Sequence, residues 1–189
     1  MPTIAELVRA RAADDHPAIL FEDRSWSYAE YVTACAERAA LLEELRRPGP
    51  FHVGVLLDNV PEFALWLGAA AVAGAVIVGI NPTRRGAELA RDITHTECQL
   101  LVTEDRYAPL LDGIETGVGP ERTFDVESAA YTEALDRHRG AALPDVEIAD
   151  SDLYLLLFTS GTSGAPKACL CSQGRLGRIG RALAGMVKL

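Results

Sequence analysis

The chain has 189 residues, and 49% of them are hydrophobic, which is enough for a sizeable core in one domain or in the front part of a larger one. Its formal net charge of −9 excludes nucleic acid as a partner, because binding nucleic acid depends on a basic face that neutralises phosphates. The polar opening residues do not resemble a signal peptide. Four cysteines in no disulfide or metal spacing predict buried, reduced thiols, as in a cytoplasmic protein: Cys35, Cys98, Cys169 and Cys171.

The first third of the chain predicts two helices, a hairpin and a strand. Residues 3–6 (TIAE) and 27–30 (SYAE) have the form of a capping box, so a helix is expected to begin at each. The second helix runs towards Leu45, before a Pro- and Gly-rich break. Residues 17–26 between the two helices favour a short hairpin, and residues 53–57 (VGVLL) a buried strand.

Residues 63–80 carry no charge over eighteen positions, a length that can cross a membrane. Gly74 and the breaker Asn81-Pro82 argue against a single span, and the composition changes from Ala-rich to β-branched after Gly74. We therefore predict a buried helix from Pro61 to about Ala73, followed by a buried strand over residues 75–80. A transmembrane span is the alternative.

The alternation of helix and strand continues through the second half of the chain. We predict a helix capped by Thr83 over residues 84–95, a strand at 99–102, a short helix at 107–113 and a weaker strand at 122–126. Residues 127–150 are polar and are expected to form a surface excursion. The pattern predicts an α/β fold whose mostly parallel sheet is covered by helices on both faces.

One segment has the residue types of a ligand-binding loop. The apolar run Leu153–Phe158 leads into the sequence TSGTSGAPK, residues 159–167. Glycines let backbone N–H groups turn inward, and hydroxyls with one lysine add donors and positive charge, so the segment is suited to hold phosphate. Its order matches neither a Walker A loop nor a nucleophile elbow. A flexible Gly/Ser/Thr linker is the alternative, but it leaves Pro166-Lys167 and the preceding strand unexplained.

Residues 158–168 resemble, at every position, the phosphate-binding loop of the adenylate-forming superfamily, which includes the acyl-CoA synthetases. Packing motifs in the same order extend the resemblance over nearly the whole chain, among them residues 53–55, 59–63 and 80–85. The last of these, together with Lys167-Ala168, is most similar to the fatty-acid transport and very-long-chain acyl-CoA synthetase branch. The resemblance implies the large N-terminal domain of such an enzyme.

The resemblance further implies a two-step ligase reaction with a fatty acid, ATP with Mg²⁺, and coenzyme A. A carboxylate attacks the α-phosphate of ATP to give an acyl-adenylate and pyrophosphate, and the thiol of coenzyme A then displaces AMP. Lys167 is implied as the catalytic residue, because it stabilises charge on the departing pyrophosphate. The implied phosphate-binding residues are Thr159, Ser160, Gly161, Thr162, Ser163, Gly164 and Lys167.

Several parts of the family pattern are not found in the twenty-two residues after Lys167. These are the segments for adenine, magnesium and ribose, and the C-terminal domain with its own lysine. We therefore expect residues 1–189 to be the N-terminal part of an AMP-binding domain, inactive by itself. The alternative is a non-catalytic phosphate- or nucleotide-binding module, or an accessory to lipid uptake. Gln173 stands where many members have a histidine, and we assign it no catalytic role.

The end of the chain, residues 175–189, has an apolar stripe at helical spacing made by Leu176, Ile179, Leu183 and Met186. Two interpretations stay open: the core face of a helix that covers the sheet, which we favour, and a basic amphipathic helix in peripheral contact with a membrane. In the isolated chain we expect this stripe to leave apolar surface uncovered. Four histidines without metal-pair spacing predict no metal site: His16, His52, His95 and His138.

Overall fold

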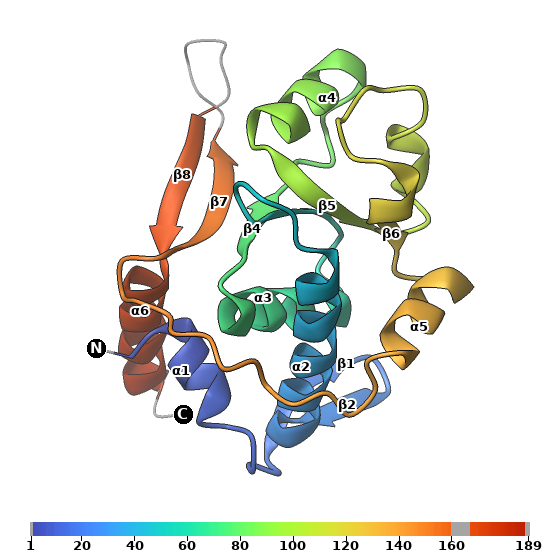
Figure 1. The fold of residues 1–189 in the computed structure, drawn as a ribbon. Coiled ribbons are helices and arrows are strands. Elements are labelled where there is room, and N and C mark those ends of the chain that lie inside the picture. Colours follow the sequence, from blue (N-terminus) through green and yellow to red (C-terminus); the bar gives the residue numbers. More distant parts are fainter. Residues whose placement is uncertain (1, 160–166, 188–189) are drawn as a thin grey trace.

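A computed structural model describes residues 2–159 and 167–187. Within them, Figure 1 shows a six-stranded sheet in the order β6-β5-β3-β4-β7-β8, and a separate two-stranded hairpin, β1-β2. Five strands of the large sheet are parallel, and β8 runs antiparallel to β7. The strands are β1 (Pro17–Phe21), β2 (Arg24–Ser27), β3 (His52–Leu56), β4 (Val76–Gly79), β5 (Cys98–Thr103), β6 (Thr123–Asp125), β7 (Leu153–Thr159) and β8 (Lys167–Ser172).

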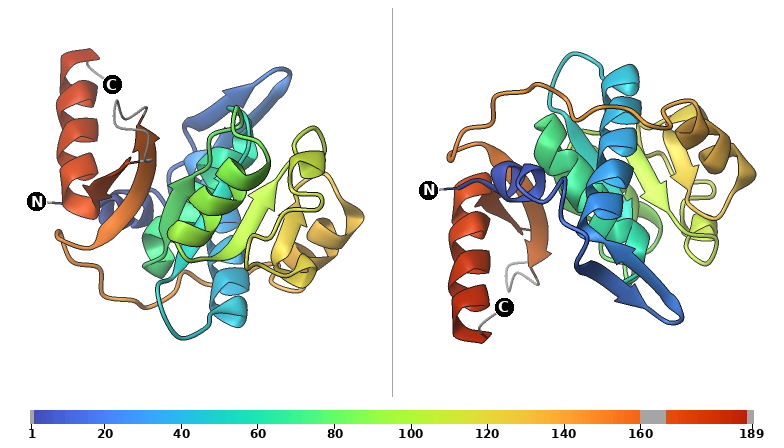
Figure 2. Two further views of the ribbon diagram at one scale, coloured as in Figure 1. Left: turned by 90° about the horizontal axis from the view of Figure 1, so that it is seen from above. Right: turned by 90° about the horizontal axis from the view of Figure 1, so that it is seen from below.

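Helices cover both faces of the sheet, as expected for this fold class (Figure 2). The helices are α1 (Ile4–Arg9), α2 (Tyr28–Leu45), α3 (Pro61–Ala73), α4 (Gly86–His95), α5 (Ala129–Asp136) and α6 (Gln173–Val187). Because β4 lies on one side of β3 and β5 on the other, right-handed crossovers place α3 and α4 on opposite faces. The predicted α/β fold with a mostly parallel sheet is confirmed.

Alternation along the strands divides the apolar side chains between two cores. Val53 and Val55 of β3 belong to the larger core with α2 and α3. Val76 and Val78 of β4 belong to the smaller core, together with Leu89 of α4. In the parallel register, Val53 and Val55 are out of phase with Val76 and Val78, so the two pairs point to opposite faces of the sheet.

The uncharged stretch 63–80 forms a buried helix and a buried strand, as predicted. Gly74 ends α3 in the left-handed conformation, with φ +70°, which glycine adopts without strain. Trp66 and Val72 of α3 are fully buried, since the helix is packed between α1, α2 and the sheet. No helix in the described part of the chain is long and apolar enough to cross a membrane.

Both capping boxes are confirmed. The Glu6 backbone N–H donates to the Thr3 hydroxyl at 3.1 Å, and Glu6 accepts from the Thr3 backbone N–H at 2.7 Å. Ser27 and Glu30 make the same reciprocal pair at the start of α2, which extends to Leu45 as expected. The hairpin between these helices is also confirmed.

Two predictions for residues 83–113 are wrong. Thr83 does not cap α4; its N–H and hydroxyl instead donate to the Asn81 side-chain oxygen at 2.9 and 2.8 Å, and the helix begins at Gly86. This local turn competes with the helix for the same donors. The predicted helix at 107–113 is reduced to a single 3₁₀ turn at Ala108–Leu110.

The segment 127–150 is not only a surface excursion, because it contains α5. Tyr131 of this helix is 2% exposed and joins a buried polar network. Its hydroxyl donates to Glu62 Oε2 at 2.7 Å and accepts from the indole N–H of Trp66 at 3.1 Å. The Arg38 guanidinium, which is buried, donates to the same Glu62 carboxylate at 3.0 Å, so the buried charge is paired. Burial raises the pKa of Tyr131, which keeps its phenol protonated.

Candidate functional site

The carboxyl end of β7 is where the predicted phosphate segment begins. β7 pairs in parallel with β4 and antiparallel with β8, and Thr159 is the register partner of Lys167. The pairing therefore brings together the two ends of residues 160–166, at the edge of the sheet where open α/β folds bind ligands (Figure 1).

The predicted site residues are only partly placed. Ser160, Gly161, Thr162, Ser163 and Gly164 lie outside the described residues. The backbone of Thr159 is placed as the last residue of β7, and that of Lys167 as the first residue of β8. Their roles at phosphate stay predictions.

The hairpin is held to the sheet mainly through β7. Leu156 and Phe158 pack in the smaller core, and the Tyr154 hydroxyl donates to the Leu67 carbonyl of α3 at 3.1 Å. The edge strand β8 is less covered, with Leu170 63% exposed. β7 therefore gives the predicted phosphate segment a fixed support at one end.

Gln173, at the start of α6, is a structural tether. Its side chain is fully buried, accepting from the Ala5 N–H of α1 at 3.2 Å and donating to the Ala71 carbonyl of α3 at 3.1 Å. Both ends of the amide are thus occupied by backbone groups. This geometry gives Gln173 a positioning role for α6.

Sequence reasoning missed a polar cluster at the carboxyl ends of β3 and β5. The Tyr107 hydroxyl donates to Asp58 Oδ1 at 2.7 Å, and Arg106 forms an ion pair with the same carboxylate. Glu104 is 6% exposed, and burial raises the pKa of its carboxyl group. Asp58 and Glu104 each follow a parallel strand closely, which is the signal that could have revealed them.

The cysteines only partly follow the prediction. Cys35, Cys98 and Cys171 are buried, whereas Cys169 is exposed because β8 is an edge strand. Burial and the neighbouring Cys169 thiol raise the pKa of Cys171.

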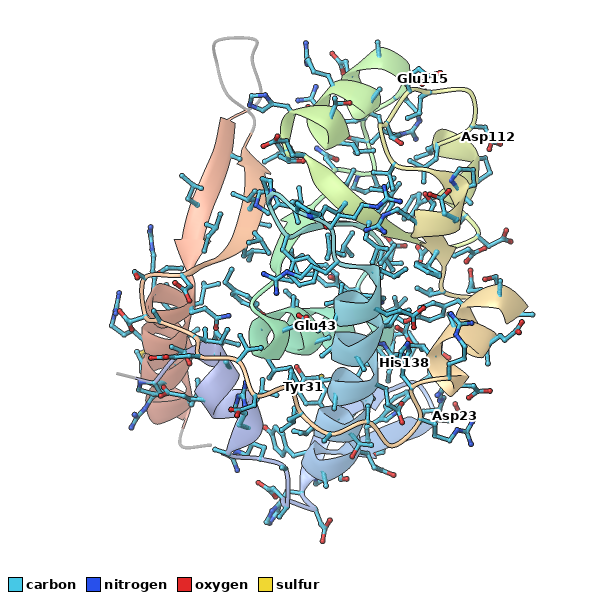
Figure 3. All side chains as sticks on the ribbon, in the orientation of Figure 1. Asp23, Tyr31, Glu43, Asp112, Glu115 and His138 are labelled. Carbon is cyan, nitrogen blue, oxygen red and sulfur yellow. The ribbon has the colours of Figure 1, made fainter. Side chains whose placement is uncertain are left out.

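Among the described residues, no group of three or more His, Cys, Asp or Glu side chains is arranged to hold a metal ion. Of the acidic side chains labelled in Figure 3, Asp23 lies at one end of the molecule, and Asp112 and Glu115 lie at the other. The prediction that the four histidines form no metal site also concerns metal binding. His138 lies beside Glu44, with 2.8 Å between its Nε2 and a carboxylate oxygen.

A parallel α/β sheet that carries this hairpin at its carboxyl edge has the architecture of the N-terminal domain of acyl-CoA synthetases. A long-chain fatty-acid–CoA ligase, FadD1, from Archaeoglobus fulgidus superposes with a TM-score of 0.85 at 23% identity, covering 100% of this chain and 40% of that one. The inhibitor-bound N-terminal domain of FACL13 from Mycobacterium tuberculosis gives 0.78 at 26% identity, covering 92% and 45%. The chain belongs to the AMP-binding enzyme family, whose pattern matches residues 7–187.

Relatives within the family are CoA ligases. The chain is 48% identical over 178 residues to the steroid-22-oyl-CoA synthetase of Rhodococcus jostii (strain RHA1), covering 94% of this chain and 32% of the relative. It is 42% identical over 180 residues to the medium/long-chain-fatty-acid–CoA ligase FadD17 of Mycobacterium marinum, covering 95% and 34%. The predicted family is confirmed, and the chain spans about a third of the length of these relatives.

Proposed function

We propose that this chain supplies the phosphate-binding hairpin of an ATP-dependent acid–thiol ligase that activates an apolar carboxylic acid. The observation that carries the proposal is the pairing of Thr159 with Lys167 at the carboxyl edge of the sheet, in a chain of the AMP-binding enzyme family. The family and the names of the relatives support a CoA ligase. Residues 1–189 would form the N-terminal part of its AMP-binding domain.

In the proposed reaction, a carboxylate oxygen of the substrate attacks the α-phosphorus of ATP, and the bond to pyrophosphate breaks. Backbone N–H groups near Gly161, Thr162 and Gly164 would bind the β- and γ-phosphates, with hydroxyls of Thr159, Ser160, Thr162 and Ser163. Lys167 would offset the charge that develops on the leaving pyrophosphate. The thiol of coenzyme A then attacks the acyl carbon and AMP leaves. Magnesium would enter with ATP.

The proposed substrate is a long- or very-long-chain fatty acid. Support comes from the sequence resemblance and from the relatives, one named for medium and long-chain fatty acids and one for a steroid acid. A steroid carboxylate shares the same chemistry, an apolar body with one carboxylate. We propose a cytoplasmic enzyme with peripheral membrane contact through α6.

The test is fatty-acid-dependent exchange of pyrophosphate into ATP by the ligase that contains this chain. Lys167→Ala should lower the exchange rate by about 100- to 1,000-fold, the usual loss when one donor to a developing oxyanion is removed. The matched control is Arg178→Ala, because Arg178 makes an exposed ion pair with Asp150. Exchange that survives in Lys167→Ala would refute the assignment.

The second candidate is a non-catalytic module that keeps affinity for phosphate or nucleotide. We expect the 189-residue chain alone to bind pyrophosphate without catalysing exchange, and a supplied C-terminal fragment to restore exchange. Binding without any restoration would favour the module.

A further inference from the structure

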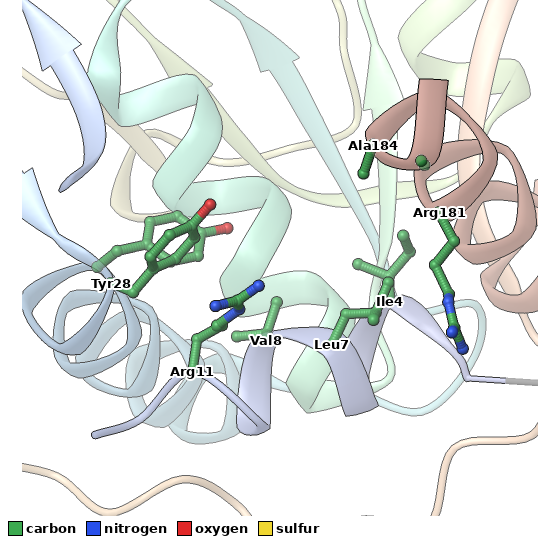
Figure 4. A pocket seen from close by; sticks show the side chains of 10 residues that line it. Ile4, Leu7, Val8, Arg11, Tyr28, Arg181 and Ala184 are labelled. Carbon is green, nitrogen blue, oxygen red and sulfur yellow. The ribbon is translucent and has the colours of Figure 1, made fainter. Parts of the chain in front are cut away.

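A pocket of about 500 Å³ lies between α1, the start of α2 and the second half of α6 (Figure 4). Its walls include Ile4, Leu7 and Val8 of α1 and Ala184 of α6. In Figure 1 these two helices lie at the opposite end of the β7–β8 hairpin from Thr159 and Lys167. The pocket is therefore separate from the predicted phosphate site.

The pocket exists because α1 and α6 diverge. At Gly177 the helices are so close that a Cβ would collide with the Pro2 carbonyl oxygen. One turn further along α6, a Cβ on Gly180 would meet no atom within 4 Å. The space between the helices thus opens from Gly177 towards Ala184, and its volume falls in the range of small-molecule sites.

Positive charge stands at both ends of this apolar wall. Figure 4 shows Arg11 beside Tyr28 at one end and Arg181 at the other, with Val8, Leu7 and Ile4 between them. Arg11 pairs with Asp14 at 2.5 Å and stacks on the Tyr28 ring at 4.9 Å. The ion pair that α6 makes with the described residues is that of Arg178 with Asp150, not of Arg181, and no carboxylate is among the described residues that line the pocket. Arg181 is therefore the available anchor for an anion.

We propose that this pocket binds a single-chain carboxylate, with the apolar tail along α1 and the carboxylate at Arg181. A carboxylate matches a guanidinium group in charge and geometry, and an alkyl tail matches the aliphatic wall. The chain as a whole carries a net charge of −9, whereas α6 contains three arginines and no acidic residue. This local charge favours an anionic ligand over a neutral or cationic one.

The site is proposed as a second, non-reacting site, so it goes beyond the ligase function. The reaction requires the acid beside ATP, and this pocket lies on α6 beyond Gln173, whose buried side chain bonds to α1 and α3. A ligand that bridges α1 and α6 would add contacts where these helices diverge.

The experiment is isothermal titration of the chain, without nucleotide, with dodecanoate below its micellar concentration. Dodecanol and dodecyltrimethylammonium are the matched probes of equal tail length. We expect one molecule of dodecanoate per chain, binding up to about fivefold weaker for dodecanol, and no measurable binding of the cation. Equal affinity for all three probes would overturn the carboxylate assignment, as would binding only to anionic vesicles.

Two variants localise the ligand. Gly180→Leu fills the pocket at an open helical position and should weaken dodecanoate binding at least tenfold, while circular dichroism shows an unchanged fold. Arg181→Ala should weaken binding about three- to fivefold, and Arg178→Ala on the same helix should leave it unchanged. Unchanged affinity in Gly180→Leu, or equal losses in the two arginine variants, would overturn the proposal. These titrations contain no ATP, so their result does not depend on the result of the pyrophosphate-exchange test of the ligase.

Discussion

We define the C-terminal arm as β8 and α6, and the body as the other helices and strands of the described chain. Both regions are rich in apolar residues, but they differ in burial. In the body, Trp66 and Ile77 are fully buried between helices and strands. In the arm, Leu170, Leu183 and Met186 are 63%, 55% and 72% exposed. The difference shows that apolar sequence produces a core only where a second layer of structure covers it.

The arm is attached to the body at a few specific points. Gln173 bonds to α1 and α3, Gly177 packs against Pro2, and Arg178 pairs with Asp150 at 3.0 Å. Of the predicted apolar stripe on α6, only Leu176 packs against the larger core. Ile179, Leu183 and Met186 are 46%, 55% and 72% exposed, so the expectation that the stripe leaves apolar surface uncovered in the isolated chain is confirmed.

The largest expected contrast is in thiol labelling. Cys169 of the arm is exposed, whereas burial raises the pKa of Cys35 to about 12 and that of Cys98 to about 11. A thiol reagent at pH 7 should modify Cys169 at least about 1,000-fold faster than the two body thiols, which react only when the body opens. Cys169→Ser should remove the fast phase. Fast modification of Cys35 would show that the body is not a closed core.

Substitutions in the body and in the arm should change the free energy of unfolding by different amounts. Trp66→Ala should lower the free energy of unfolding by about 3–5 kcal/mol, because it removes a fully buried ring and leaves a cavity. The control in the arm, Leu183→Ala, should change it by no more than about 0.5 kcal/mol. Urea denaturation measures both. Equal losses would contradict the contrast.

The polar network tests whether α5 belongs to the body. Tyr131→Phe keeps the ring but removes the hydroxyl that hydrogen-bonds to both Glu62 and Trp66. The free energy of unfolding should therefore fall by about 1–3 kcal/mol. The Tyr107→Phe control removes a hydroxyl from the less buried pair with Asp58 and should cost less. If Tyr131→Phe left the free energy of unfolding unchanged, α5 would not be an integral part of the body.

The last comparison concerns two glycines one turn apart on α6, one of which, Gly180, is expected to give the smallest effect. Gly177→Ala should destabilise the chain by about 1–3 kcal/mol, because its Cβ meets the rigid Pro2 backbone. Gly180→Ala meets no neighbour and should stabilise it by up to about 1 kcal/mol through helix propensity. Thermal unfolding of the two variants measures the opposite signs. The same sign in both would mean that α6 does not dock on α1 as described.

Local patterns predicted most of the fold. Each capping box uses atoms within four residues. The change from helix α3 to strand β4 at Gly74 depends on one backbone angle and on the residues beside it. Such signals act before distant segments meet, so α2, α3 and β4 could be derived from sequence. The phosphate segment was likewise identified from its residue order, although residues 160–166 lie outside the described part.

The features that could not be predicted depend on residues far apart in the chain. Tyr131 is buried because Glu62 and Trp66 offer it partners 69 and 65 positions away. Cys169 is exposed because β8 is an edge strand, which only the strand order reveals. By itself the sequence determined the elements, the family resemblance and the candidate phosphate residues. Tertiary structure decided which apolar and polar groups are covered, because burial is set by what packs against a residue and not by the residue itself.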